Sequence, residues 1–240
     1  MRVELRIEIA RRQRRTALAC AIAFFFAPHA ILAGSAEIQV RDAAGAPVVD
    51  AVVSLVPADG SAAPPASPAP AGAREASASM DQRNIQFAPH VLAVQRGAAV
   101  DFPNSDQIRH HVYSFSEAKR FELRLYSGVP AEPVVFDQAG TVVLGCNIHD
   151  DMIGFIRVLD TPWYATTGEP GLAHIANVPP GRYKVELWHP RAQDASADLV
   201  LEVAEGAPVH LDAPLRLGPE PTRDRPKRLL RDRLRDGRGP

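Results

Sequence analysis

Residues 146–152, which read CNIHDDM, constrain the fold of this chain more than any other segment. They bring a thiol, an imidazole and a thioether into one short stretch that follows the apolar run at residues 141–144. Far upstream, His110 and His111 open a segment of alternating strand-like residues. These side chains can act together only in a fold that carries a distant strand to the CNIHDDM stretch.

The donor types in this set point to metal chemistry. A thiolate, imidazoles and a thioether form the ligand set of a blue-copper site, because copper that changes oxidation state takes a compromise between soft and borderline ligands. Cys146, His149 and Met152 are each separated by two residues. A Cys-His nucleophilic pair is an alternative, although no third orienting residue is evident and Met152 has no role in it. Zinc is a further alternative, but it prefers another N, O or S donor to a thioether.

The chain begins with a predicted export signal. Four arginines between residues 11 and 15 form a basic segment, and the apolar segment TALACAIAFFFA follows. Pro28 interrupts this run before it reaches the roughly 20 residues of a membrane span. We therefore expect a signal peptide at residues 1–36, cleaved after Ala33 or Ala36, and a periplasmic protein without a stable membrane span.

The cysteine count bears on the same question. Cys20 lies in the predicted signal, so Cys146 is the only cysteine of the mature chain. Exported proteins usually hold cysteines in pairs, because their compartment is oxidising. A single thiol there needs burial or a metal to protect it, and the odd count therefore favours ligation.

Charge is distributed unevenly although the formal net charge is −1. Residues 1–33 carry six Arg and two Glu, and residues 216–240 carry nine basic and four acidic side chains, which leaves residues 34–215 at −10. An acidic folded part argues against nucleic-acid binding and is compatible with a positively charged protein partner. The Arg-rich residues 218–240 lack a sustained apolar face and are predicted to be a disordered tail.

Short alternating segments separated by turn residues predict an all-β protein. Residues 37–41, a turn at residues 42–45 and a strand at residues 51–56 predict an opening β-hairpin. Residues 58–79 are dominated by Ala and Pro and are predicted to be a flexible linker. Strand spacing over the remainder favours a sandwich or barrel. Further strands are predicted at residues 85–87, 91–94, 99–102, 112–115, 122–126, 134–136, 141–145, 154–159, 199–203 and 209–217.

Two motifs that flank the middle of the chain resemble the carboxypeptidase-regulatory-like domain, a small transthyretin-like β-sandwich. They are the D-x-x-G-x-P-V turn that begins at Asp42 and the phrase NVPPGRYKV that begins at Asn177. In that family a short stretch separates them, whereas here the segment with all the predicted ligands intervenes. Because insertions are tolerated at exposed loop tips, the resemblance implies a domain at residues 80–160 inserted between two parts of one sandwich, at residues 37–57 and 161–217.

Residues 80–160 resemble the cupredoxins, and amicyanin most closely, through the short C-x-x-H-x-x-M loop. The HHVYSFS segment is also similar to methylamine-utilisation-type proteins of bacteria. This resemblance implies a Greek-key β-sandwich that binds one type 1 copper ion through His110, Cys146, His149 and Met152. Neighbouring residues of a strand face opposite sides, so only one histidine of the pair is expected to bind, and the match favours His110 over His111.

The chain also departs from the amicyanin pattern. Asp150 and Asp151 stand where amicyanin has an apolar, Pro-containing pair. Two carboxylates beside the metal favour the more highly charged Cu(II) and so lower the potential. The site is therefore either tuned to a low potential or binds copper without fast electron exchange. His90, His174, His189 and His210 show no ligand spacing and are expected to have ordinary surface or core roles.

The resemblance implies a periplasmic blue copper protein that is not an enzyme. It would carry single electrons between redox partner proteins, such as a periplasmic dehydrogenase or a cytochrome, with His149 as the exposed edge of the site. Two alternatives stay open. One is a copper carrier or storage protein, which the acidic residues Asp150 and Asp151 in the ligand loop would favour. The other is a non-catalytic binding protein in which copper is structural or absent.

Overall fold

The computed structural model describes residues 32–64, 78–130, 132–193 and 198–219. All helix or strand elements in these ranges are β-strands, which confirms the all-β prediction. No helix among the described residues is long and apolar enough to cross a membrane. The predicted signal up to residue 31, most of the predicted linker and the tail from residue 220 lie outside the described residues.

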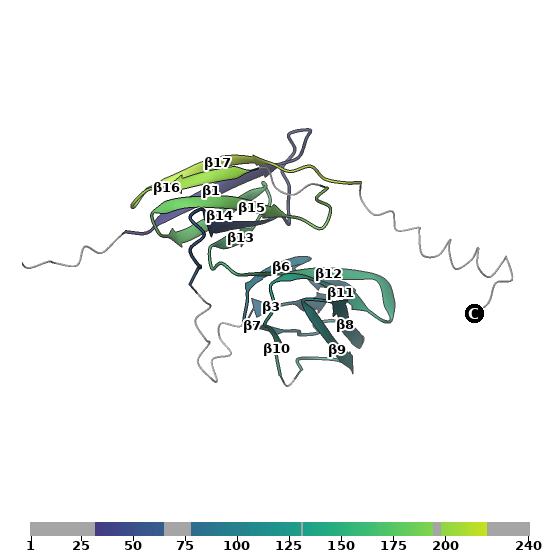
Figure 1. Cartoon of the computed structure of the whole chain (residues 1–240). Coiled ribbons are helices and arrows are strands. Elements are labelled where there is room, and N and C mark those ends of the chain that lie inside the picture. The colour runs from purple at the N-terminus through teal and green to yellow at the C-terminus, as the bar shows by residue number, and fades with distance from the viewer. Residues whose placement is uncertain (1–31, 65–77, 131, 194–197, 220–240) are drawn as a thin grey trace, which may run out of the picture. The chain divides into compact units, whose positions relative to one another are not determined.

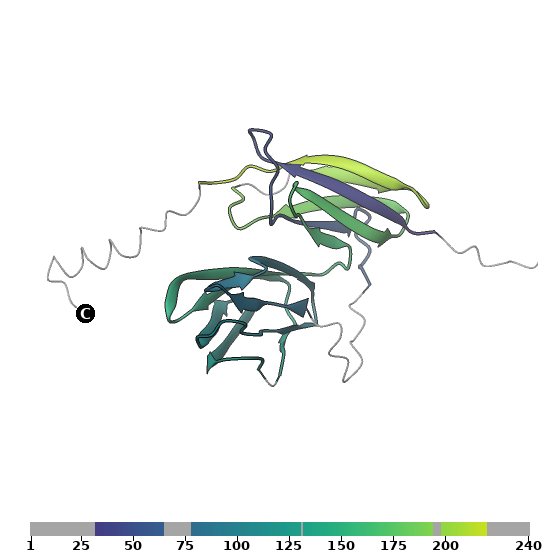
Figure 2. The same cartoon turned by 180° about the vertical axis from the view of Figure 1, so that it is seen from behind.

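One hydrophobic core is built from the two ends of the described chain. It lies between the sheets β14-β1-β17 and β13-β2-β15-β16. Along β1, Ala36, Ile38 and Val40 are fully buried and alternate with half-buried polar residues, as a strand with one solvated face requires. In Figure 2, β1 (purple) runs beside β17 (yellow-green). The strands are β1 (Gly34–Arg41), β2 (Val52–Pro57), β13 (Tyr164–Thr166), β14 (Leu172–Val178), β15 (Gly181–Trp188), β16 (Leu199–Val203) and β17 (Pro208–Pro214).

The predicted opening β-hairpin is wrong, because β1 and β2 lie in different sheets. The predicted turn itself is present. Asp42 Oδ1 accepts hydrogen bonds from two backbone N–H groups, and Gly45 has φ +83°, which glycine adopts without a steric cost. The returning chain follows β1 only as far as Val48, whose N–H donates to the carbonyl of Val40. β2 then crosses to the other sheet, where its first four residues are all buried.

The start of β1 bears on the signal boundary. β1 begins at Gly34, inside the predicted signal at residues 1–36. A Cβ atom on Gly34 would lie 2.7 Å from the carbonyl oxygen of Ala204, and Ala36 is fully buried. Cleavage after Ala36 would remove the first three residues of this strand, whereas cleavage after Ala33 leaves it whole. The packing therefore favours the earlier of the two predicted positions.

A second hydrophobic core lies within residues 78–159. It is covered by the five-stranded sheet β6-β12-β11-β8-β9 and by the three-stranded sheet β10-β7-β3, with β4-β5 as a small additional pair (Figure 1). The predicted linker at residues 58–79 extends too far, since β3 already pairs with β7 at Ala78. The strands are β3 (Ala78–Ser79), β4 (Asp81–Arg83), β5 (Gln86–Ala88), β6 (Val91–Gln95), β7 (Ala98–Asp101), β8 (His110–Ser116), β9 (Lys119–Tyr126), β10 (Val134–Phe136), β11 (Gly140–Cys146) and β12 (His149–Leu159).

The CNIHDDM stretch is the tip of a tight hairpin between β11 and β12. Cys146 ends β11, two turn residues follow, and His149 begins β12 opposite Cys146. The preceding register pair is Gly145 with Ile153, so three residues of β12 bulge out of the ladder. Residues three apart in a regular strand face opposite sides, and a bulge redirects side chains. The bulge therefore allows His149 and Met152 to lie on the same side as Cys146.

Candidate metal centre

Three of the four predicted ligands come together at one end of three neighbouring strands. His110 begins β8, Cys146 ends β11 and His149 begins β12. The Sγ atom of Cys146 lies 3.6 Å from Nδ1 of His110 and 3.9 Å from Nδ1 of His149. One donor atom from each residue lies within 4.8 Å of the other two.

These distances suit a shared ion. Metal–sulfur and metal–nitrogen bonds of about 2.3 and 2.0 Å, set at roughly 110° to 120°, separate the donor atoms by about 3.5 to 3.7 Å. The sulfur–nitrogen separation to His110, 3.6 Å, lies within this range, and the separation to His149, 3.9 Å, is slightly longer. Both imidazoles present the same nitrogen, Nδ1, to the sulfur. Cys146, His110 and His149 therefore fit a single metal ion of the size that thiolate and imidazole bind.

Met152, the fourth predicted ligand, is 1% exposed and belongs to the same hydrophobic core as Cys146. Both residues also line one surface groove of about 420 Å³. The structure thus places both sulfur-bearing side chains along one groove, each of them almost fully buried. A thioether is a weak ligand, and burial of Met152 leaves little of its side chain in contact with solvent.

Asp106 fixes the orientation of His110. Its Oδ2 atom lies 2.8 Å from Nε2 of His110, a ring that is fully buried. Because Nε2 pairs with the carboxylate, the other ring nitrogen, Nδ1, faces Cys146. Metal-binding histidines are commonly oriented by a carboxylate in this way. Desolvation alone raises the pKa of Asp106, but hydrogen bonds from the Ile85 backbone, from His110 and from the Asn84 backbone outweigh it and lower that pKa.

Sequence reasoning did not find the role of Asp106. The available signal was its position four residues before His110 in the polar turn PNSDQIR. Asn104 organises the same turn. Its Nδ2 atom donates to the carbonyls of Ile108 and Tyr126, and its Oδ1 atom accepts from the N–H of Asp106. Asn104 therefore holds the loop that presents the carboxylate to the imidazole.

His111 is placed away from the other donors. Its Nε2 atom lies 2.9 Å from Oε1 of Glu122, on the neighbouring strand β9. His110 is fully buried, whereas the His111 side chain is 15% exposed. This is the alternation of sides that a strand imposes on neighbouring residues.

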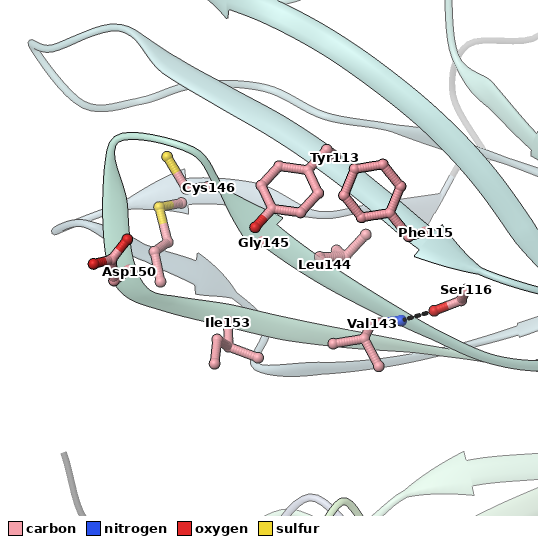
Figure 3. A pocket seen from close by; sticks show the side chains of 10 residues that line it. Tyr113, Phe115, Ser116, Val143, Leu144, Gly145, Cys146, Asp150 and Ile153 are labelled. Atoms are coloured by element: carbon pink, nitrogen blue, oxygen red, sulfur yellow. Dashed lines mark hydrogen bonds between the residues drawn. The ribbon is translucent and has the colours of Figure 1, made fainter. Parts of the chain in front are cut away.

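The ring of Tyr113 lies against β11 beside Cys146. A Cβ atom on Gly145 would come within 2.8 Å of the ring and hydroxyl of Tyr113. Glycine is therefore required at this position for the ring to lie this close to the strand. Figure 3 shows Tyr113, Phe115 and Asp150 around the groove that reaches Cys146.

The solvent side of the centre is formed by His149 and the bulge. His149 is half-buried, while Asp150 and Asp151 are exposed. Asp150 also lines the groove that reaches Cys146 and Met152. His149 and the two aspartates are thus the solvent-exposed part of the centre, while the two sulfur-bearing side chains are almost fully buried.

No protein-family model and no curated protein matches the chain. Among solved structures it is similar to an oxidised variant of amicyanin, with 22% identity and a TM-score of 0.33 over 37% of this chain and 88% of that one. It is similar to a copper-containing nitrite reductase from Thermus scotoductus SA-01, with 24% identity and a TM-score of 0.33. That match spans 35% of this chain and only 22% of the reductase.

A purple cupredoxin from Nitrosopumilus maritimus is also similar, with 20% identity and a TM-score of 0.31 over 35% of this chain and all of that one. At TM-scores this low, none of these likenesses carries weight for fold or function. What defines the centre is its own geometry: a buried thiol between two imidazoles, one of them anchored by a carboxylate.

Proposed function

We propose that residues 78–160 form a cupredoxin-type module, and that the protein is a blue copper protein that carries single electrons and is not an enzyme. One copper ion would be held by His110, Cys146, His149 and Met152. The observation that carries the proposal is the position of the Cys146 sulfur, 3.6 and 3.9 Å from two imidazole nitrogens. When bound, copper supplies one-electron oxidation and reduction.

The packing of the ligands suits electron transfer. His110, Cys146 and Met152 are between 0% and 2% exposed, so surrounding side chains fix their positions. The strands that carry His110 and Cys146 are joined by backbone pairing, as are those that carry Cys146 and His149. Side chains held in this way move little when the charge at the site changes. A small rearrangement favours fast transfer, and half-buried His149 provides the edge that a partner can reach.

The proposal also includes the cellular location, the redox partners and the class of the flanking sandwich. Export to the periplasm is supported by the basic and apolar N-terminal segments and by the single remaining cysteine. Partners would be redox proteins such as a periplasmic dehydrogenase or a cytochrome, and the HHVYSFS likeness points to methylamine utilisation. We assign the flanking sandwich to the carboxypeptidase-regulatory-like class from its two motifs and from the shared core of its two parts.

Stopped-flow mixing of the Cu(II)-loaded mature protein with a small reductant tests the electron-transfer role. We expect fast single-exponential reduction, and equally fast reoxidation by a small oxidant. Slow exchange together with retention of Cu(I) against a chelator would contradict the proposal and favour the copper carrier. The Cys146→Ala variant is the control. It lacks the thiolate, so the visible absorption that reports reduction of the Cu(II) protein should be absent.

A further inference from the structure

A second group of metal-type donors lies on the flanking sandwich, outside the centre at Cys146. Glu37 on β1 pairs in register with His174 on β14 and with His210 on β17. These three strands are neighbours in one sheet, so the side chains form a row, His174–Glu37–His210, across its solvent side. Their side chains are 57%, 32% and 70% exposed.

Both imidazoles direct a nitrogen at the carboxylate between them. The Nδ1 atom of His210 lies 3.0 Å from Oε2 of Glu37, and Nδ1 of His174 lies 3.6 Å from Oε1. Nitrogen and oxygen ligands of one zinc ion, with bonds of about 2.0 to 2.1 Å at roughly 90° to 110°, lie about 2.9 to 3.4 Å apart. Each imidazole nitrogen therefore lies close to the carboxylate between the two rings, although the three donor atoms do not all lie within 4.8 Å of one another before an ion is bound.

We infer that this row binds a divalent transition-metal ion through two imidazoles and one carboxylate. Imidazole suits Zn²⁺ and Cu²⁺, and Cu²⁺ binds most tightly among the first-row divalent ions. The side chains are exposed, so both rings can turn about their side-chain bonds towards one ion above the carboxylate. Asp212 follows His210 by two residues and is exposed on the same side of β17, which adds negative charge near the row.

The inferred site differs in chemistry from the centre at Cys146. Its donors are nitrogen and oxygen without sulfur, so bound Cu²⁺ would lack the thiolate charge-transfer colour. The inference does not depend on the proposed electron-transfer role, because no residue is shared. It also revises the expectation that His174 and His210 have ordinary surface roles: their separation in sequence hides the adjacency that the sheet creates.

Calorimetric titration with Zn²⁺ tests the inference, with the protein carrying Cys146→Ala and His149→Ala to remove ligands of the other centre. We expect one Zn²⁺ per chain. Glu37→Gln, His174→Ala and His210→Ala should each weaken binding roughly tenfold or more, since even the loss of a group behind a ligand costs about 10- to 100-fold. The matched control is His90→Ala, which removes an exposed histidine that also lies by a carboxylate. It should leave the affinity within about twofold.

Electron paramagnetic resonance of the same proteins loaded with Cu²⁺ provides a second readout. The expected spectrum shows nitrogen coupling from the row, and this coupling decreases in the His174→Ala and His210→Ala variants. Far-ultraviolet circular dichroism checks that the variants are folded. Absence of Zn²⁺ binding, or binding that the three row substitutions leave unchanged, would overturn the inference.

Discussion

The Nε2 atom of His110 lies 2.8 Å from Oδ2 of Asp106, on the opposite side of the ring from the nitrogen that faces Cys146. This pairing orients a fully buried imidazole before any metal arrives. A carboxylate in this position also increases the basicity of the ligand. Asp106 is therefore a positioning residue of the centre, although it is not a ligand.

Replacement of Asp106 should weaken copper binding. We expect Asp106→Ala to lower the affinity by about 10- to 100-fold, and Asp106→Asn to lower it less because the amide oxygen still accepts the hydrogen bond. Competition with a chelator of known affinity measures the change. Asp137→Ala is the control, since Asp137 pairs with Lys119 on the surface of the same module. An unchanged affinity in Asp106→Ala would show that packing alone orients His110.

Substitution of each member of the histidine pair should give opposite results. His110→Ala removes the nitrogen 3.6 Å from the Cys146 sulfur and should abolish the visible band of the Cu(II) protein. His111→Ala removes a partner of Glu122 and should leave the band with at most a small shift. Visible absorption and far-ultraviolet circular dichroism together separate ligand loss from unfolding. Persistence of the band in folded His110→Ala would reverse the ligand choice.

The two aspartates of the bulge on β12, Asp150 and Asp151, should lower the reduction potential of the copper site. Asp150→Asn and Asp151→Asn together remove two negative charges near the ligands. Negative charge favours Cu(II) over Cu(I), so the double variant should have a midpoint potential higher by tens of millivolts, as screened interactions of exposed charges allow. Protein-film voltammetry at low ionic strength measures it. If the potential does not move, both carboxylates are oriented away from the metal.

The contact between Gly145 and Tyr113 should appear as a stability effect. A methyl group at residue 145 would lie 2.8 Å from the ring, and overpacking of this kind costs about 1 to 3 kcal/mol. We expect Gly145→Ala to lower the free energy of unfolding of the metal-free protein in urea. In the Tyr113→Ala background the same change should cost much less. If Gly145→Ala lowers the free energy of unfolding equally with and without the Tyr113 ring, the effect comes from the backbone at residue 145 and not from the contact with Tyr113.

The grouping of His110, Cys146 and His149 could be predicted because residue type and sequence spacing indicate a shared set of donor atoms. Cys146, His149 and Met152 lie close in sequence, strand alternation indicates that only one histidine of the pair can bind, and the resemblance to the cupredoxins favours His110. The bulge on β12 could not be predicted, since a run of seven residues can be a loop or a hairpin tip. Asp106 was missed because the turn that brings its carboxylate to Nε2 depends on backbone hydrogen bonds and on Asn104.

The sheet partners of a strand were the least predictable part of the fold. Asp42 and Gly45 correctly indicate where the chain turns. They do not indicate that β1 pairs with β14 and β17, because these partners are distant in sequence. The same long-range pairing places His174 and His210 on either side of Glu37, which spacing along the chain does not reveal.

The absorption spectrum of the purified mature protein after addition of one equivalent of Cu(II) tests the central claim most directly. A thiolate bound to Cu(II) between two imidazoles predicts an intense visible charge-transfer band that is absent from the Cys146→Ala variant. A colourless Cu(II) complex, or a band that persists without the thiol, would contradict the assignment of His110, Cys146 and His149 as one copper centre.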